Sequence, residues 1–554
     1  MTSSLVQSVD WLTIAPPTLT AVVALVVLVA DLFVPEERKR LLGWTAIGGL
    51  VAALALLVPL RAGDRSTFCL TADTQVRACS YTADDFTLVI QLLVLGGALL
   101  TALLSLTETS DPLGARGRTR SGTTDGASGP TGTAEHGGAT GSREKLPAGE
   151  FWFLLLASAA GAALLPASRD LATLVVALEV ASLPAFALVG LKRGDRGSGE
   201  AALKFFLSSV TATAVTLLGV SFVYAATGTL HLTELAQGLD DVPGQLQTLA
   251  EAGVALTLVG FAFKTAAVPF HFWVPDTYVG APLPVAAYLS VVGKAVGFTG
   301  LILVTVVAFP SYADVWGPAL AVLAALTMTA GNVAALRQRS TRAWSAVRLL
   351  AWSSVAQAGY LLVPIAAAAY SSDDQIGATV AYALMYAVVN LGAFAVVALV
   401  ARRHPRNRIA DYRGLYATSP AAALALAFFL LNLAGLPPGI IGLFAKVTVF
   451  SAAVDAGLGW LAVIMGVNVV IALYYYLRWT ALLFRTPEGT PEGAPAGAPE
   501  GASAGAPEET PTTVPVPHPA PVSITLAIAL TAAAGVVLSG YPQFALRFAS
   551  DSLF

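Results

Sequence analysis

The chain has 554 residues, of which 56% are hydrophobic and only 12% are charged, and its mean hydropathy is +0.72. A soluble domain carries about 25% charged residues, so this composition excludes a soluble protein and indicates an integral membrane protein. The formal net charge of −3 gives no support to a nucleic-acid partner.

Fourteen apolar stretches follow one another along the chain, and a membrane-spanning helix needs about 20 such residues. We expect spans near 17–34, 41–60, 84–107, 150–166, 170–191, 201–226, 248–268, 282–309, 317–336, 345–368, 375–401, 419–454, 457–484 and 520–540. The first stretch is followed by PEERKR instead of a small-residue cleavage site, which indicates a span and not a cleaved signal peptide. The predicted fold class is therefore an all-α integral membrane protein with about fourteen transmembrane helices.

Lysine and arginine fall mostly in alternate loops, and cytoplasmic loops carry an excess of these residues. With the N-terminus outside, the basic runs all fall in inner loops, at 38–40, 116–145, 192–196, 337–348, 402–413 and 478–485. The outer segments hold only Arg61, Arg65, Arg77, Arg169 and Arg547. Both termini are therefore predicted on the outer side of a multi-pass membrane protein.

Three segments between the predicted spans differ from the membrane core. Residues 109–148 and 486–521 are rich in Gly, Pro, Ala and Thr, cannot bury enough apolar surface to offset ordering, and are expected to be disordered inner loops. Cys69 and Cys79 share one outer loop, where either a disulfide or two free thiols is compatible with the sequence.

Two of the predicted spans are interrupted by prolines. In 264–284 four prolines prevent a continuous helix, and in 432–450 the run GLPPG breaks another span. Such breaks at membrane depth occur where the freed backbone groups are buried or meet water, as in transporters with paired discontinuous helices. The broken spans are the seventh and twelfth, five apart, so spans 4–8 and 9–13 are predicted to form two inverted five-helix repeats.

Five ionisable residues interrupt long apolar stretches: Glu179, Lys204, Lys264, Lys294 and Lys446. A charge at the bilayer centre costs roughly 2.5–3.5 kcal/mol, so such residues usually face the protein interior and serve ion or proton movement. Each one alone could instead snorkel or form a structural ion pair, and Lys204, only about four residues inside its span, is the clearest case for snorkelling. The set as a whole indicates a protein that moves charge across a membrane.

Several motifs give the chain a family resemblance. The segment 260–285 (GFAFKTAAVPFHFWVPDTYVGAPLPV) resembles the signature of the antiporter-like subunits of proton-pumping NADH-quinone oxidoreductase, respiratory complex I. Further matches are LEVASLPAFALVG, EAALKFFLSS, AWSSVAQAGYLLV, YALMYAVVNLGAFAVV, DYRGL and LAGLPPGIIGLFAK. Among the three antiporter-like subunits, DYRGL, NLGAF and a lysine on the broken twelfth helix are most similar to subunit N.

The resemblance implies a role in proton translocation for Glu179, Lys204, Lys264, Lys294, Lys446 and His271. Glu179 and Lys264 match a charge pair that would open and close, since a nearby carboxylate favours a charged lysine and burial disfavours it. His271 matches a histidine on the proton path. Gln357 departs from the pattern, because many members carry histidine there; glutamine does not titrate, so water would have to bridge.

The expected organisation has six parts: helices 1–3 at 1–108, the disordered loop 109–148, a first antiporter-like repeat at 149–309, a second at 310–485, the disordered loop 486–521, and helix 14 with the tail at 522–554. No phosphate-binding glycine loop, cysteine cluster or dinucleotide fingerprint occurs in the sequence. No cofactor is therefore expected in this chain, and NAD, FMN, iron–sulfur clusters and quinone are expected in partner subunits.

The predicted partners are the other membrane subunits of complex I (neighbouring antiporter-like and small membrane subunits) and the lipid bilayer, the transported species is the proton, and the predicted location is a bacterial plasma membrane. The main alternative is a subunit of a multi-subunit monovalent cation/proton antiporter or of a membrane-bound hydrogenase, which share the Glu and Lys motifs. A stand-alone transporter of an organic solute and a purely structural membrane subunit are weaker alternatives, because neither accounts for the row of titratable residues.

Overall fold

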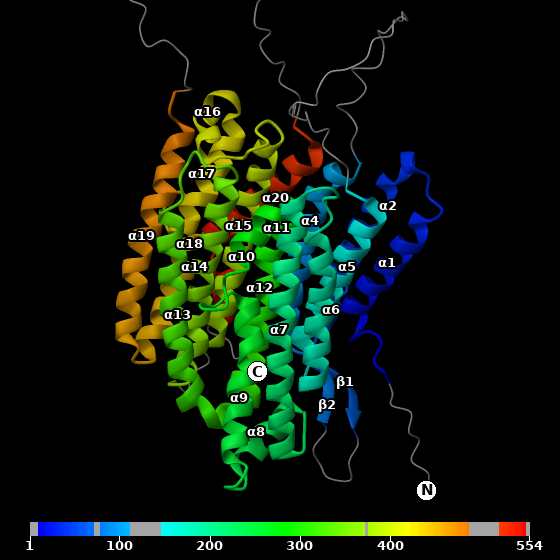
Figure 1. Cartoon of the computed structure of the whole chain (residues 1–554), viewed down its shortest axis with the longest axis vertical. Coiled ribbons are helices and arrows are strands. Elements are labelled where there is room, and N and C mark those ends of the chain that lie inside the picture. Colours follow the sequence, from blue (N-terminus) through cyan, green and yellow to red (C-terminus); the bar gives the residue numbers. More distant parts are fainter. Residues whose placement is uncertain (1–8, 71–77, 111–145, 372–374, 487–519, 550–554) are drawn as a thin grey trace, which may run out of the picture.

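The computed structural model describes residues 9–70, 78–110, 146–371, 375–486 and 520–549, and Figure 1 shows them as a bundle of long helices. The first part of the chain forms α1 (Ala15–Asp31), α2 (Arg40–Ala55), α3 (Leu57–Leu60), α4 (Asp85–Ser110), α5 (Ala148–Leu164), α6 (Leu171–Val189), α7 (Arg196–Thr227), α8 (Leu232–Asp240), α9 (Gln247–Thr265), α10 (Val274–Gly280), α11 (Leu283–Tyr288) and α12 (Lys294–Ile302). The second part forms α13 (Ala313–Leu336), α14 (Ser345–Ala367), α15 (Ile376–Ala401), α16 (Leu415–Thr418), α17 (Pro420–Ala434), α18 (Ile441–Asp455), α19 (Gly459–Leu483), α20 (Val522–Gly540) and α21 (Gln543–Leu546).

Some helical segments depart from α geometry. Two π-helical stretches, Leu289–Gly293 and Leu303–Ala308, flank α12, so that α11 to residue 308 form one continuous span. Short 3-10 turns lie at Glu36–Arg38, Leu165–Ala167, Pro310–Tyr312, Ile409–Tyr412 and Arg547–Ala549. π-helical turns inside a helix are frequent at functional sites, and here one of them directly precedes Lys294.

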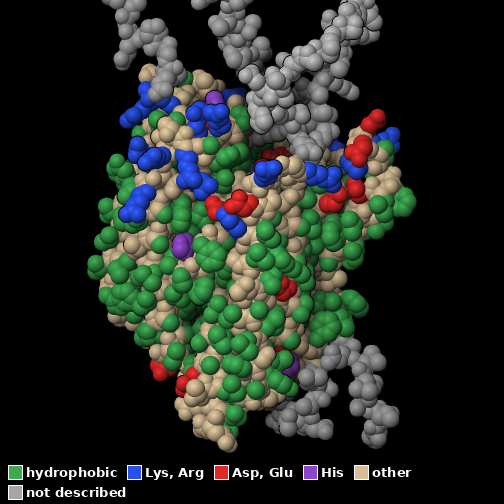
Figure 2. Space-filling model, viewed as in Figure 1, with side chains coloured by type: hydrophobic (Ala, Val, Ile, Leu, Met, Phe, Trp, Pro, Cys, Tyr) green, Lys and Arg blue, Asp and Glu red, His purple; other side chains and the backbone are tan. Residues whose placement is uncertain are grey.

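The helical membrane character predicted from the sequence is confirmed. Within the described residues, 12 helices are long and apolar enough to cross a membrane, and α1 and α17 are shorter apolar helices. The two segments predicted to be disordered, 109–148 and 486–521, lie almost wholly outside the described residues. Lysine and arginine side chains gather at the upper end of the molecule in Figure 2, where α16 and α17 lie in Figure 1.

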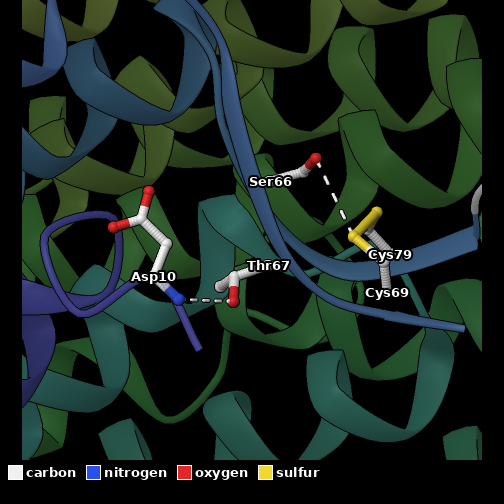
Figure 3. The surroundings of a disulfide bond; sticks show 5 residues. All are labelled: Asp10, Ser66, Thr67, Cys69 and Cys79. Atoms are coloured by element: carbon white, nitrogen blue, oxygen red, sulfur yellow. Dashed lines mark hydrogen bonds between the residues drawn. A yellow bond between two sulfur atoms is a disulfide. The ribbon is translucent and has the colours of Figure 1, made fainter. Parts of the chain in front are cut away.

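The prediction of an all-α chain missed a small β-hairpin. The strands β1 (Arg65–Leu70) and β2 (Ala78–Ala83) pair antiparallel, with Cys69 opposite Cys79, and these two cysteines form a disulfide (Figure 3). The backbone N–H of Asp10 donates to the Thr67 hydroxyl, which fixes the chain before α1 to β1. The sequences RSTFCL and ACSYTA contain the β-branched and aromatic residues that strands favour, but both are too short and polar to stand out between apolar helices.

Small residues allow close packing of the long helices. A Cβ at Gly331 of α13 would lie 2.4 Å from the Ala356 backbone nitrogen of α14, and a Cβ at Gly219 of α7 would lie 2.4 Å from the Thr257 nitrogen of α9. Backbones of membrane helices approach closely where glycine removes the side chain. These two contacts bring α7 close to α9 and α13 close to α14.

Candidate functional site

Lys264 lies in the last turn of α9, directly before the first break. Its side chain is 5% exposed, and its ammonium donates to the Ser209 hydroxyl of α7 at 2.8 Å. Three phenylalanine rings surround the ammonium at centroid distances of 5.0, 5.4 and 5.8 Å, those of Phe186, Phe205 and Phe263. Aromatic faces attract a cation at such distances, so the rings and the serine together solvate the charge.

Glu179 lies on α6, beside the same helix α7. Its carboxylate accepts a hydrogen bond from the Thr213 hydroxyl at 2.7 Å. Among the ion pairs of the described residues, none joins Glu179 to Lys264; each of the two contacts α7 instead. The expected charge pair is therefore adjacent but open in this structure.

Lys294 lies at the start of α12 and is the most deeply buried of the lysines that the structure describes, at 1% exposure. Within the described part of the chain, its ammonium has no hydrogen-bond partner, and the ring of Tyr278 lies 5.9 Å away. The Lys294 ammonium is therefore poorly solvated in this structure.

Lys446 lies in α18, after the second break, and is 5% exposed. Its ammonium donates to the backbone carbonyls of Leu433 at 3.0 Å and Ala434 at 2.6 Å. These are among the last carbonyls of α17, which have no partner inside their own helix and form the negative end of its dipole. Lys446 thus caps the first half of its own broken helix.

The structure places Lys204 apart from the buried lysines. Its side chain is 51% exposed and pairs with Glu200 at 2.6 Å and Asp276 at 3.2 Å. Asp276 also pairs with Arg348 of α14 at 3.4 Å. Asp276 therefore braces α10 between α7 and α14, at the more polar end of the broken helix.

His271 lies in the loop between α9 and α10, at the first break. Its ring centroid is 5.6 Å from that of Trp352 of α14. Its Nδ1 is buried and has no hydrogen-bond partner within the described residues. The imidazole is thus located between the first broken helix and the second half of the chain.

A stripe of uncharged polar residues on α15 lies between Ser290, one turn before Lys294, and the cavity beside Lys446, and it was not predicted from the sequence. Tyr382, Tyr386 and Asn390 recur every four residues, so they lie on one face of α15. The Asn390 amide donates at 2.6 Å to the hydroxyl of Ser290, a residue one turn before Lys294. The hydroxyl oxygens of Tyr386 and Ser354 are 2.9 Å apart. Their spacing in an otherwise apolar helix is the signal that would have revealed them.

The far end of this α15 stripe reaches Lys446. The Tyr382 hydroxyl donates to the Gln357 amide oxygen of α14. Both residues line a small cavity together with Tyr386, Asn432 and Lys446. A second small cavity, lined by Ser158, Ser182, Lys264, Tyr288 and Gly293, lies on the side of Lys264 that faces α12.

The residues present can hold and pass protons, but they offer no site of the usual metal-binding kind: within the described ranges, no group of three or more His, Cys, Asp or Glu side chains could hold a metal ion. Three buried lysines, the partly buried Glu179 and a set of hydroxyl and amide groups are present instead.

Sequence comparisons relate the chain to one family. Residues 168–472, more than half of the chain, match the family model described as NADH:quinone oxidoreductase/Mrp antiporter, TM. NADH-quinone oxidoreductase subunit N 2 of Streptomyces griseus is 75% identical over 551 residues, covering 100% of this chain and 95% of that protein. Subunit N of Salinispora tropica is 44% identical over 497 residues, 87% of each chain.

Solved structures show the same architecture. A chain of respiratory complex I from Thermus thermophilus with bound aureothin is 29% identical, with a TM-score of 0.68 and coverage of 97% of this chain and 100% of that one. A chain of the Mrp complex from a Dietzia species has a TM-score of 0.76 at 21% identity, covering 97% of this chain and 96% of that one, and this likeness concerns the fold alone.

Proposed function

This chain belongs to the NADH-quinone oxidoreductase subunit N family, and we propose that it translocates protons. The main path would run through Glu179, Lys264, Lys294 and Lys446. His271 and Lys204 would assist proton transfer along it. The chain is a proton-pumping membrane subunit of that enzyme complex, which couples electron transfer from NADH to quinone to proton movement. NAD, FMN, the iron–sulfur clusters and quinone then bind in partner subunits.

One observation carries the assignment of residues: three lysines are 5%, 1% and 5% exposed inside a bundle of membrane helices. A buried charge in the membrane is expensive, so a chain retains it where it serves a function. The Lys264 ammonium contacts a serine and three phenylalanine rings. The Lys294 ammonium lies in an apolar pocket beside one tyrosine ring, and the Lys446 ammonium contacts two backbone carbonyls. Such a series favours the transfer of a proton from one lysine to the next.

The proposed route runs from Lys264 through the adjoining cavity to Lys294, and from there along the α15 stripe to Lys446. Between Lys294 and Lys446 no acid is needed, because hydroxyl groups and water pass a proton by exchanging one hydrogen bond for the next. Gln357 cannot gain or lose a proton. Its amide oxygen instead accepts from the Tyr382 hydroxyl and holds this residue in place, and water in the cavity beside Lys446 completes the path.

The finer architecture is part of the same proposal. Together with the 12 long apolar helices, α1 and the broken pair α17–α18 would complete fourteen crossings. The first repeat would occupy 149–309 and the second 310–485, with inverted orientation and one broken helix each. The gathering of basic side chains at one end in Figure 2 supports a cytoplasmic assignment for that end and an outer location for both termini and the β-hairpin.

We place the chain in a bacterial plasma membrane, next to the other antiporter-like and small membrane subunits of the complex. The alternative, a subunit of a multi-subunit cation/proton antiporter, has the same fold. The identity of 75% to a subunit N over the whole chain favours the oxidoreductase.

The deciding experiment measures NADH:quinone reductase activity and proton pumping in closed membrane vesicles that carry Lys264→Ala. We expect pumping to fall to near background while the complex still assembles. Thr45→Ala, a change at an exposed hydroxyl that bonds the Leu41 carbonyl of α2, is the matched control. Normal pumping by Lys264→Ala would refute the proposed path.

A second pair of variants tests Lys294 as a proton carrier. Arginine keeps the positive charge but does not deprotonate in proteins. Lys294→Arg is therefore expected to impair pumping nearly as much as Lys294→Ala. If arginine restored full pumping in closed vesicles, the charge of Lys294 would be structural.

A further inference from the structure

Helix α7 binds both members of the charge pair. Glu179 bonds Thr213, and Lys264 bonds Ser209, at 2.7 and 2.8 Å. Ser209 is 1% exposed and Thr213 is 7% exposed, so both hydroxyls lie in the protein interior. Neither residue belongs to the row of ionisable groups, yet each bonds one member of it.

The spacing of the two hydroxyls matches one helical turn. Residues four apart lie on the same face of a helix, about 6 Å apart along its axis. The end of a lysine side chain can move that far by rotation about its side-chain bonds. Lys264 can therefore leave Ser209 for Glu179 without any movement of the backbone.

The position of Lys264 on Ser209 is a defined site and not an arbitrary rotamer. The rings of Phe186, Phe205 and Phe263 surround the ammonium there, and Phe205 stacks on Trp273 with centroids 4.4 Å apart. The stacking restricts the Phe205 ring, which keeps one wall of this site in place. The ammonium thus has two alternative environments, serine with aromatic rings or a carboxylate.

We propose that Ser209 and Thr213 are positioning residues that hold the Glu179–Lys264 pair open, each by occupying one partner. The inference rests on the proposed proton path through Lys264. Closure of the pair replaces two hydroxyl contacts with one ion pair, so the hydroxyls set the balance between the two states. Protons pass onward only while the pair alternates, and loss of either hydroxyl shifts the balance towards the closed state.

The test compares five single variants on α7, four of which remove a hydroxyl and one of which, Thr213→Ser, keeps it. Thr213→Val and Ser209→Ala remove the two interior hydroxyls. Thr211→Val and Ser208→Ala remove neighbouring hydroxyls that bond only to carbonyls of their own helix in the described structure, those of Leu207, Lys204 and Phe205. Pumping and NADH:quinone reductase activity are measured in vesicles and divided by the amount of assembled complex.

A hydrogen bond to a charged group shifts an equilibrium by roughly tenfold or more, so we expect Thr213→Val and Ser209→Ala to lower pumping per complex at least about threefold. The two controls are expected to pump as the unchanged protein does. Thr213→Ser keeps the hydroxyl and removes only a methyl group, so it should restore most of the activity. A purely packing role of Thr213 predicts the reverse order, because valine has the shape of threonine and serine does not.

The outcomes separate this inference from the proposed function. Full pumping by Thr213→Val, or a serine variant worse than the valine variant, would overturn the positioning role while Lys264→Ala remained inactive. Full pumping by Lys264→Ala would overturn both. Since the threonine series changes no charge, it decides the question even where Ser209→Ala assembles poorly.

Discussion

Lys264 and Lys446 stand beside the two breaks of the bundle, but the breaks are closed in different ways. At the first break the carbonyl of Phe263 accepts from the Trp273 indole N–H at 3.1 Å and from the Ala266 N–H at 3.0 Å. At the second, the carbonyls of Leu433 and Ala434 are bound by Lys446 itself. Because Trp273 and the loop backbone bind the carbonyl at the first break, Lys264 is available to exchange partners. Lys446, in contrast, itself caps the end of α17.

Two lysines in similar sequence contexts therefore have different surroundings. Lys264 bonds a side chain that a neighbouring carboxylate can replace, so its surroundings can change. Lys446 bonds main-chain carbonyls at the negative end of α17, and these carbonyls stay in place. On the proposed path, the first site would switch between partners and the second would receive the proton.

Among the proposed variants, we expect the greatest loss of assembly from a substitution at Gly442, where the two halves of the second broken helix meet. A Cβ there would lie 1.8 Å from the backbone oxygen of Asn432, so Gly442→Ala must force α17 and α18 apart. We expect loss of the assembled complex, measured by native gel electrophoresis of solubilised membranes. Gly466→Ala on α19 is the control, because nothing lies within 4 Å of its added Cβ. Normal assembly of Gly442→Ala would show that α17 and α18 can move apart at the second break without loss of the complex.

Replacing each lysine in turn by methionine tests whether the two sites differ in their contribution to stability. Lys446→Met leaves two buried carbonyls without a donor, each costing roughly 1–3 kcal/mol, whereas Lys264→Met leaves a serine hydroxyl that can turn to its own helix. Both variants should stop pumping. In detergent, however, the apparent melting temperature should fall by several degrees more for Lys446→Met than for Lys264→Met. Equal melting temperatures would mean that Lys446 is no more structural than Lys264.

A smaller effect is expected from exchanging the residues that turn the chain at the breaks. Gly435 has φ +88° and Ala266 has φ 69°, a region that costs a residue with a side chain about 1–2 kcal/mol. Gly435→Ala adds that cost and brings a Cβ to 3.3 Å from Lys446 Cδ. Ala266→Gly removes the cost but gains freedom in the unfolded chain, so it should be nearly neutral.

Melting temperature and pumping rate of these two variants provide the measurement. A moderate loss for Gly435→Ala and almost none for Ala266→Gly is the expected pattern. Equal losses in both variants would show that the turns at the two breaks contribute alike to stability and pumping.

The buried lysines and the broken helices were predictable because they violate simple rules. Lysine does not belong in apolar stretches and proline does not belong inside helices, so Lys294, Lys446 and the run GLPPG stood out in the sequence. Helical membrane architecture followed from composition and from the length of the apolar stretches. These features depend on local chemistry, which a single sequence displays.

The partners of each lysine were not predictable in the same way. That Lys264 meets Ser209, and Lys446 the carbonyl of Ala434, depends on how distant helices pack. Serine and threonine are common in membrane helices, so Thr213 gave no signal by itself. The β-hairpin was missed because its short strands resemble an ordinary loop between two much stronger apolar stretches.

The α15 stripe between Lys294 and Lys446 consists of hydroxyl and amide groups that stay neutral at physiological pH. A proton crosses such a stretch by exchange along hydrogen bonds, so no heavy atom has to travel. A sodium or potassium ion must give up its hydration shell and find several oxygens at once, and here Tyr382, Tyr386 and Asn390 already bond to their neighbours. On the proposed route, this stretch would select the proton by its manner of movement, without a fixed charge to reject metal cations.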